Sequence, residues 1–336
     1  MKTKVVALLI LLAPVIGFAQ LLTSQEKQTI FNNVKIAFKK DYHFKNQVAN
    51  IINRLDQNWK AGHYAKLNKR EDFTNELSKD LKEIAKDNHL NFFYATADEA
   101  REQAKGPNMP WGLINPKFLN NGLNKIEILE GDIGYLRIQA FGYMDDILPA
   151  AFKFLSETRA LIIDLRGNGG GTLSNMAASY LLPEDSILIN TIFWNDRTDS
   201  IFTHRKIAGP RYTDKPVYLL TDKGTFSSAE EFVYDLQALK RVTIVGETTG
   251  GGANPGGVVP IYTFKDSSRL GLFVSMAHVV NPITKSNWEG TGVKPDILIE
   301  SKDALTKAHR LAIENVMQKE TNAMIKKEYE EILKKI

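Results

Sequence analysis

Cysteine is missing from the sequence, which has none among its 336 residues. This absence excludes a disulfide framework, a cysteine nucleophile and a cysteine-linked lipid anchor. A strong charge of one sign is missing too, because 43 lysines and arginines against 39 aspartates and glutamates leave a formal net charge of +4. So small a charge does not favour binding to nucleic acid, and we expect no nucleic-acid partner.

Long hydrophobic runs are lacking, except for one run from Val5 to Val15 that follows two lysines near the N-terminus. The run is shorter than the roughly 20 apolar residues of a membrane-spanning helix. Gly17 and Ala19 supply the small side chains that signal peptidase reads. We therefore predict a signal peptide at residues 1–19, cleaved after Ala19, and an exported protein, periplasmic or extracellular, with no membrane span after cleavage. The alternative is an uncleaved N-terminal anchor.

Motifs for metals and nucleotides are also absent. The sequence has no HExxH and no paired Cys/His spacing, which are patterns typical of zinc sites. Its glycine-rich stretch, residues 164–171 (DLRGNGGG), lacks the Gly-Lys-Ser/Thr of a phosphate-binding loop, and Thr172 stands where a dinucleotide motif needs its last glycine. We expect no metal and no cofactor.

The N-terminal part of the chain has helical periodicity. Apolar residues recur at spacings of three and four between residues 23 and 86, and a short strand-like run follows at residues 89–94. A stretch with several prolines at residues 97–125 then reads as an irregular connection. We predict an N-terminal helical domain, a small bundle, at residues 20–96 that ends in a strand.

From residue 126 onward, strand-like and helix-like segments alternate. The predicted strands cover residues 133–138, 160–165, 216–220 and 242–246, and the predicted helices cover residues 144–155 and 228–239. Such alternation is typical of an α/β layer fold. We therefore predict an α/β core over residues 126–336, which closes with a C-terminal helix.

The glycine-rich stretch 164–171 follows the buried strand predicted at residues 160–165. Ligands gather at the carboxyl ends of such strands, and glycine lets backbone N–H groups approach a reacting atom closely. The stretch is therefore a candidate oxyanion hole, with a purely structural tight turn as the alternative. We interpret Asp164 and Arg166 as structural support for this turn, through an ion pair or hydrogen bonds, in preference to substrate contacts.

A second candidate segment, residues 221–231 (TDKGTFSSAEE), lies between a predicted strand and a predicted helix. Its two serines stand at a helix N-terminus, where free N–H groups and the helix dipole favour developing negative charge. Ser228 and Glu231 also have the spacing of a capping box. We predict that Ser228 caps the helix and that Ser227 is the nucleophile, while a purely structural capping segment is the alternative.

Four motifs, taken in order, resemble those of the S41 peptidases: residues 164–171, 224–230 (GTFSSAE), 245–249 (VGETT) and 289–296 (EGTGVKPD). The resemblance covers residues 126–308, and the four motifs together are specific although each alone is weak. It implies a crotonase-like ββα-spiral core with Ser227 as the nucleophile. It also implies an oxyanion hole made by the amide of Ser228 and a glycine of the pair Gly169 and Gly170.

Two departures from the tail-specific S41 members decide the branch. The stretch that carries their lysine base corresponds here to residues 250–253 (GGGA), which contain no lysine, and no room is left for a PDZ insertion. Both features resemble the tricorn-core and retinoid-binding-protein branch, whose enzymes use Ser, His and Glu. That resemblance implies His89, in residues 87–90 (DNHL), as the general base and Glu289 as the orienting carboxylate. A base of near-neutral pKa and an acceptor that fixes its tautomer complete the chemistry that Ser227 needs.

The sequence thus favours an exported serine peptidase that cleaves peptides or unfolded protein through an acyl-enzyme on Ser227. Activity is expected to rise with pH through a value near the roughly 6.5 of an ordinary histidine, or higher if Glu289 stabilises the charged form of His89. The alternative is a non-catalytic binding module for an extended peptide or a hydrophobic ligand, because retinoid-binding relatives share the fold. Endopeptidase and exopeptidase activity both stay open, and the sequence does not predict the oligomeric state.

Overall fold

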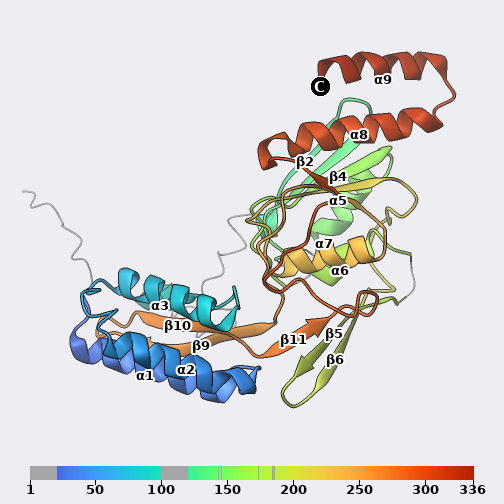
Figure 1. Ribbon diagram of the computed structural model, residues 1–336. Helices are drawn as coiled ribbons and strands as arrows, with labels where there is room; N and C mark the ends of the chain where they lie inside the picture. The colour runs from blue at the N-terminus through green and yellow to red at the C-terminus, as the bar shows by residue number, and fades with distance from the viewer. Residues whose placement is uncertain (1–20, 100–119, 143, 145, 173, 184–185) are drawn as a thin grey trace, which may run out of the picture.

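A computed structural model describes residues 21–99, 120–142, 144, 146–172, 174–183 and 186–336 (Figure 1). The predicted signal peptide at residues 1–19 and most of the predicted connection at residues 97–125 lie outside the described residues. The predicted α/β class with a helical N-terminal region is confirmed. Among the described residues, no helix is both long enough and apolar enough to cross a lipid bilayer.

The centre of the protein is a six-stranded sheet with the strand order β12-β8-β7-β4-β3-β2. Its strands are β2 (Leu123–Leu129), β3 (Ile133–Ile138), β4 (Ala160–Asp164), β7 (Val217–Thr221), β8 (Thr243–Gly246) and β12 (Ile297–Leu298). Neighbouring strands run parallel except for β2, which is antiparallel to β3. Every residue of β4 and β7 is buried, as expected for a parallel sheet with both faces covered. The carboxyl ends of these two strands lead into the two candidate segments.

Helices cover both faces of this sheet. They are α5 (Ile147–Leu155), α6 (Ser174–Ser179), α7 (Ser228–Ala238), α8 (Ala304–Lys319), which follows the 3-10 turn η2 (Ser301–Asp303), and α9 (Ala323–Lys335). Leu161 and Ile163 of β4 pack with α5, α6 and α7, whereas Ile162 points to the opposite face, which α8 covers. The outermost helix is α9, which lies on α8 and away from the sheet (Figure 1).

The N-terminal helices α1 (Ser24–Asp41), α2 (Lys45–Lys60) and α3 (Arg70–Ala85) pack against a second sheet (Figure 1). This sheet has the order β1-β10-β9 and contains β1 (Phe92–Ala95), β9 (Gly256–Thr263) and β10 (Arg269–Ser275). Alternate residues of β10, namely Leu270, Leu272 and Val274, are fully buried in one hydrophobic core with the helices. The predicted bundle is therefore completed by two strands from the second half of the chain.

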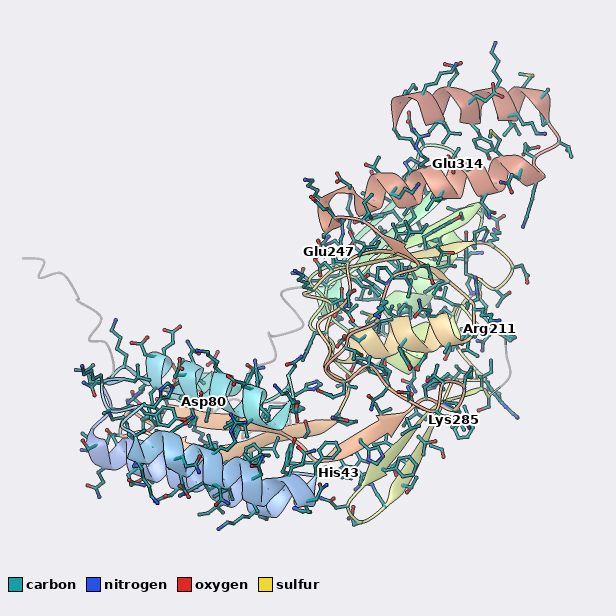
Figure 2. All side chains as sticks on the ribbon, viewed as in Figure 1. His43, Asp80, Arg211, Glu247, Lys285 and Glu314 are labelled. Atoms are coloured by element: carbon teal, nitrogen blue, oxygen red, sulfur yellow. The ribbon has the colours of Figure 1, made fainter. Side chains whose placement is uncertain are left out.

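A third sheet, with the order β11-β5-β6, adjoins the N-terminal sheet. Its strands are β5 (Leu188–Trp194), β6 (Thr198–Phe202) and β11 (Ala277–Val280). Only Met276 separates β10 from β11, so the chain passes directly from the second sheet into the third. His43, between α1 and α2, meets His278 of β11 with 2.8 Å between Nε2 and Nδ1, and Figure 2 labels His43 at this junction. The junction holds the two smaller sheets together beside the core.

Three element boundaries differ from the predicted ones by more than a residue or two. Strand β2 begins at Leu123, inside the predicted connection, and α5 begins at Ile147, later than the predicted residue 144. Strand β1 begins at Phe92 because the preceding residues form a turn, in which the N–H of Asn91 donates to the carbonyl of His89 at 2.7 Å. This turn matters for function, since it carries the predicted base.

Candidate active site

Ser227 lies in a tight loop between β7 and α7. Its backbone has φ +57° and ψ −126°, a conformation that residues with a side chain rarely adopt and that persists only when the surroundings impose it. Oδ1 of Asp222 organises the loop by accepting the N–H groups of Gly224 at 2.9 Å and Thr225 at 3.1 Å. The same oxygen accepts the N–H of Gly167 at 2.9 Å, so one carboxylate joins the serine loop to the glycine-rich loop.

The prediction that Ser228 caps the helix is wrong. Ser227 occupies the N-cap position, and its N–H donates to Oε2 of Glu230 at 3.1 Å, so the capping box lies one residue earlier than predicted. Ser228 is the first helical residue, and its hydroxyl donates to the carbonyl of Gly171 at 2.7 Å. The buried Glu230 also accepts the N–H groups of Gly251 and Gly252, each at 2.7 Å. It therefore ties the start of α7 to the loop that follows β8.

His89 reaches Ser227 from the turn between α3 and β1. Oδ1 of Asp87 accepts the backbone N–H of His89 at 3.0 Å, which fixes the turn. The imidazole packs between the rings of Phe226 and Phe273, with centroid distances of 4.7 and 5.0 Å. Its Nε2 lies 3.1 Å from Oγ of Ser227, within hydrogen-bond distance. The fold thus brings together two residues that lie far apart in the sequence.

Glu289 lies beside this pair without a hydrogen bond to the imidazole. Its Oε2 accepts the N–H groups of Ala253 at 2.7 Å and Asn254 at 2.9 Å. Asp87, His89 and Glu289 each place one carboxylate oxygen or ring nitrogen within 4.8 Å of those of the other two residues. Among the described residues, Nδ1 of His89 is buried without a hydrogen-bond partner, and so is Oδ2 of Asp87. The carboxylate is therefore next to the ring that it is predicted to orient, but a small shift is needed to join them.

Burial shifts the pKa values of this group strongly. It lowers the pKa of His89 to about 4, helped by the positive charge of Lys82, in place of the value near 6.5 or above that the sequence led us to expect. Burial, together with the charge of Asp87, raises the pKa of Glu289 to about 7. Burial also raises the pKa of Asp87. At neutral pH the imidazole is consequently uncharged and ready to accept a proton.

The glycine-rich loop packs directly against the nucleophile. Gly170 has φ +102°, and a Cβ atom there would lie 2.9 Å from both Cβ of Ser227 and the backbone nitrogen of Ser228. The N–H of Gly170 donates to Oδ1 of Asn168 at 2.8 Å, so this amide is already occupied. Of the predicted donors, this leaves the amides of Gly169 and Ser228, and the latter has no acceptor inside its helix because it opens α7.

Asp164 and Arg166 form an ion pair beneath this loop. The Nε and NH2 groups of Arg166 donate to the two carboxylate oxygens of Asp164 at 2.8 and 2.6 Å, and the Tyr135 hydroxyl donates to Oδ2 at 2.7 Å. Burial of the carboxylate opposes its ionisation, but the hydrogen bonds from Arg166 and Tyr135 hold the pKa of Asp164 below its usual value. The pair therefore braces the start of the glycine turn and faces the protein interior.

A cavity of about 750 Å³ opens above Ser227. Its lining comes from several elements, and the largest contributors are the side chains of Phe93, Ile192, Phe226, Phe273, Val279 and Trp288. Asn254 also lines it, and its Oδ1 is buried without a hydrogen-bond partner among the described residues. The site is thus mainly apolar with a few polar groups around the nucleophile, which is the usual character of a binding cleft.

Among the residues that the structure describes, two groups of side chains lie close enough to share a metal ion. One is the trio of Asp87, His89 and Glu289 in the site itself. The other, on α3 and the preceding loop, combines His63 with Glu76 and Asp80, and Figure 2 labels Asp80 there. In the first group the imidazole Nε2 faces Ser227, and in the second the imidazole Nε2 lies 3.0 Å from Glu76.

Sequence reasoning missed two buried residues that shape the site, Asn168 and Glu230. Asn168 accepts the N–H of Phe226 on its carbonyl at 2.9 Å and donates its Nδ2 to Ile138 at 3.0 Å. Both residues lie within the motifs recognised in the sequence. The signal for Asn168 was a polar side chain between two glycines, and the signal for Glu230 was an acid three residues after Ser227.

Comparison with known proteins places these features in a family. The family model for peptidase family S41 matches residues 132–299, and the model for the N-terminal domain of peptidase S41 in eukaryotic IRBP matches residues 20–121. A carboxyl-terminal-processing protease of Synechocystis sp. is 30% identical over 175 residues, which are 50% of this chain and 38% of that protease. The chain thus matches less than half of the length of this relative.

Solved structures agree in fold. A candidate peptidase from Parabacteroides merdae superposes with a TM-score of 0.57 at 21% identity, over 85% of this chain and 96% of that one. The photosystem II D1 C-terminal processing protease gives a TM-score of 0.50 at 17% identity, over 84% and 94% of the two chains. At such identities these likenesses establish the shared fold alone.

Proposed function

The chain belongs to peptidase family S41, and on this premise we propose that it is an exported serine peptidase that cleaves peptides or unfolded protein. The observation that carries the proposal is the 3.1 Å contact between Nε2 of His89 and Oγ of Ser227 at the floor of the cavity. A buried, neutral imidazole beside a serine hydroxyl is the arrangement that nucleophilic catalysis requires. The export assignment rests on the predicted signal peptide at residues 1–19.

In the proposed reaction, Oγ of Ser227 attacks the carbonyl carbon of the scissile bond while its proton moves to Nε2 of His89. The amides of Ser228 and Gly169 are proposed to donate to the oxyanion that forms. Collapse of this tetrahedral intermediate breaks the C–N bond, and His89 gives its proton to the departing amine. Water then attacks the acyl-enzyme, again with His89 as the base, and releases the acid product and Ser227.

Glu289 is proposed to accept the Nδ1 proton of His89 and to stabilise the imidazolium. The low pKa of His89 makes this help necessary, because burial disfavours the charged ring that forms during each proton transfer. Two backbone amides already hold the Glu289 carboxylate beside the ring. We propose that bound substrate closes the remaining gap, since catalytic hydrogen bonds are often long before substrate binds.

Labelling with a fluorophosphonate, followed by mapping of the modified residue, tests the proposal. We expect the label on Ser227, and we expect Ser227→Ala to lose both label and peptide hydrolysis while its thermal unfolding stays close to that of the wild type. Ser228→Ala is the matched control: it loses the hydroxyl contact with Gly171, about 1 kcal/mol of stability, but keeps its amide and should be labelled. A folded wild type that takes no label and cleaves no peptide would favour the binding module.

A further inference from the structure

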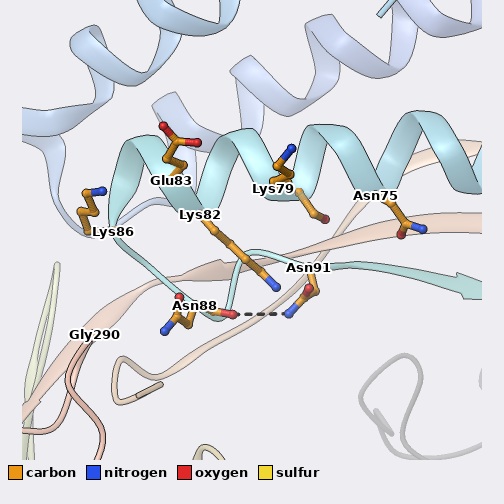
Figure 3. A pocket seen from close by; sticks show the side chains of 9 residues that line it. Asn75, Lys79, Lys82, Glu83, Lys86, Asn88, Asn91 and Gly290 are labelled. Atoms are coloured by element: carbon orange, nitrogen blue, oxygen red, sulfur yellow. Dashed lines mark hydrogen bonds between the residues drawn. The ribbon is translucent and has the colours of Figure 1, made fainter. Parts of the chain in front are cut away.

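A second cavity, of about 700 Å³, lies along α3 beside the turn that carries His89 (Figure 3). Three lysines of the helix and its C-cap line it, Lys79, Lys82 and Lys86, together with the side chains of Asn88 and Asn91 from the turn. We call it the lysine pocket. Its lining carries a surplus of positive charge, because it contains three lysines and one carboxylate, that of Glu83. The Glu83 side chain points away from Lys82 (Figure 3).

Lys82 is the residue that makes the pocket unusual. Its side chain extends toward Asn91 and away from the other two lysines (Figure 3). The side chain is half-buried, and burial lowers the pKa of Lys82 although the charge of Asp87 opposes the shift. Within the described residues, no carboxylate lies at ion-pair distance from its ammonium group. A partly desolvated cation without a partner is costly, and an anion placed beside it would remove much of that cost.

The surrounding groups can complete an anion site. Asn91 donates its Nδ2 to the carbonyl of Asn88 at 3.4 Å, a long bond that a better acceptor can replace (Figure 3). The hydroxyl of Ser78 accepts the N–H of Phe92 at 3.3 Å and keeps its own proton free to donate. Lysine, unlike arginine, offers a compact charge that does not demand a planar two-pronged ligand. A carboxylate is the simplest group that satisfies these donors.

The lysine pocket adjoins the cavity above Ser227. Asn91 lines both cavities, and His89 lies two residues before it in the same turn. A peptide chain in the catalytic cleft would extend past Asn91 to reach Lys82. An extended chain covers roughly 3.3 Å per residue, so a carboxylate a few residues from the scissile bond would arrive at the pocket.

On the basis of the proposed peptidase function, we infer that the lysine pocket binds a carboxylate of the peptide substrate while the scissile bond lies at Ser227. The carboxylate comes either from the C-terminus of the substrate or from an aspartate or glutamate side chain. Lys82 is then a specificity residue, which selects substrates by the position of their negative charge.

Matched peptides test this inference. One series carries a free C-terminal carboxylate at increasing distance from the cleavage site, the second carries a C-terminal amide, and the third combines the amide with one aspartate at the same distances. We expect the acid peptides to exceed the amides in kcat/KM by about tenfold at one preferred distance, the scale of a hydrogen bond to a charged group. The third series shows whether a side-chain carboxylate substitutes for the terminal one. Equal kcat/KM for acids and amides at every distance would overturn the inference.

Lys82→Met should abolish the acid-to-amide ratio, whereas Lys60→Met, a change of an exposed lysine on α2, should leave it intact. The ratio within each variant is the readout because the charge of Lys82 also affects His89, which acts on both peptides alike. Binding of the same peptides to Ser227→Ala, followed by fluorescence anisotropy, separates this inference from the proposed function. Selective binding of acid peptides, without hydrolysis by the wild type, would support carboxylate binding in the lysine pocket and contradict the peptidase function. Hydrolysis without selectivity would support the peptidase function and contradict carboxylate binding in the pocket.

Discussion

His89 and Glu289, the two groups proposed to assist Ser227, have pKa values in the opposite order to those of free histidine and glutamate side chains. Between about 4 and about 7, His89 is neutral while the carboxyl group of Glu289 stays protonated. A protonated carboxyl group cannot stabilise an imidazolium by charge. We therefore predict that kcat/KM rises with pH through about 7, as Glu289 loses its proton, and not through the pKa of His89.

Glu289→Gln tests this assignment in a pH–rate profile. The variant should lose the rise near pH 7 and follow the pKa of His89 near 4 instead, with a lower plateau because the amide carries no charge. Stability gives an independent readout. Because folding raises the pKa of Glu289 from 4.5 to about 7, the stability that the protonated group contributes is lost as pH rises from about 4.5 to about 7. The free energy of unfolding of the wild type, relative to the variant, should thus fall over that range, and an unchanged rate profile would contradict the role of Glu289.

For single residues, the sequence indicated which residues lie in the candidate site, but it indicated their contacts poorly. The motifs placed Ser227, His89 and Glu289 in one reaction, and the fold brings their side chains together. The capping role predicted for Ser228 was wrong because it depends on which residue first takes helical dihedral angles, a one-residue difference in register. The low pKa of His89 was equally out of reach, since it follows from the aromatic rings of Phe226 and Phe273 that tertiary packing brings around it.

Gly169 and Gly170, two neighbours in the glycine-rich loop, should respond differently to substitution by alanine. Gly170→Ala would place a Cβ 2.9 Å from the Ser228 nitrogen at a φ of +102°, whereas Gly169→Ala would meet no atom within 4 Å. We expect Gly170→Ala to lose about 100 to 1000 fold in kcat, because its Cβ crowds the amide of Ser228, one of the two proposed oxyanion donors, and also some stability through strain. Gly169→Ala should keep its amide and most of its activity. Kinetics and thermal unfolding of both purified variants check this, and equal activities would exclude the loop from the reaction.

The loop after β8 leaves no space for the lysine of tail-specific members, which supports the proposal of His89 as the base. A Cβ at Gly252 would lie 2.2 Å from the Phe226 ring and 2.8 Å from Cε1 of His89. The space that a lysine stem would need is therefore filled by the base itself and by the ring that packs on it. The backbone of Gly252 is fixed as well, because its N–H donates to Glu230 and its carbonyl accepts from the Trp288 indole at 2.8 Å.

Predicted elements agree with the structure where their contacts are local or their strands are fully buried. Strand β3 has the predicted bounds, and β4, β7, β8 and α7 differ from theirs by a residue or two. Apart from β1, the strands of the two smaller sheets were not predicted, namely β5, β6, β9, β10 and β11. Their register depends on pairing across long sequence distances, and β9 contains Gly256, Gly257 and Pro260, which weaken any strand signal.

The same long-range pairing unites the whole molecule. Sequence periodicity separates a helical N-terminal part from an α/β core, but the structure shares one hydrophobic core between the N-terminal helices and strands β9 and β10. The turn that carries His89 is anchored there, because β1 pairs with β10 from Phe92 to Ala95. A substitution in the N-terminal core would thus act on catalysis by moving the base.

Two deletions at opposite ends of the molecule should therefore behave differently. Removal of α9 exposes the partners of Tyr329 and Ile332, which are 2% and 4% exposed, and should cost about 3 to 6 kcal/mol for two large buried side chains. Because α9 packs on α8 and lies away from Ser227 (Figure 1), the shortened protein should still label and cleave at moderate temperature.

Removal of residues 21–96 instead takes away His89 and uncovers Leu270, Leu272 and Val274, which are fully buried. We expect that fragment to aggregate, and to become soluble and take the fluorophosphonate label only when residues 21–99 are co-expressed with it. A soluble, folded fragment in the absence of the N-terminal helices would show that the core is independent and that the shared packing is dispensable.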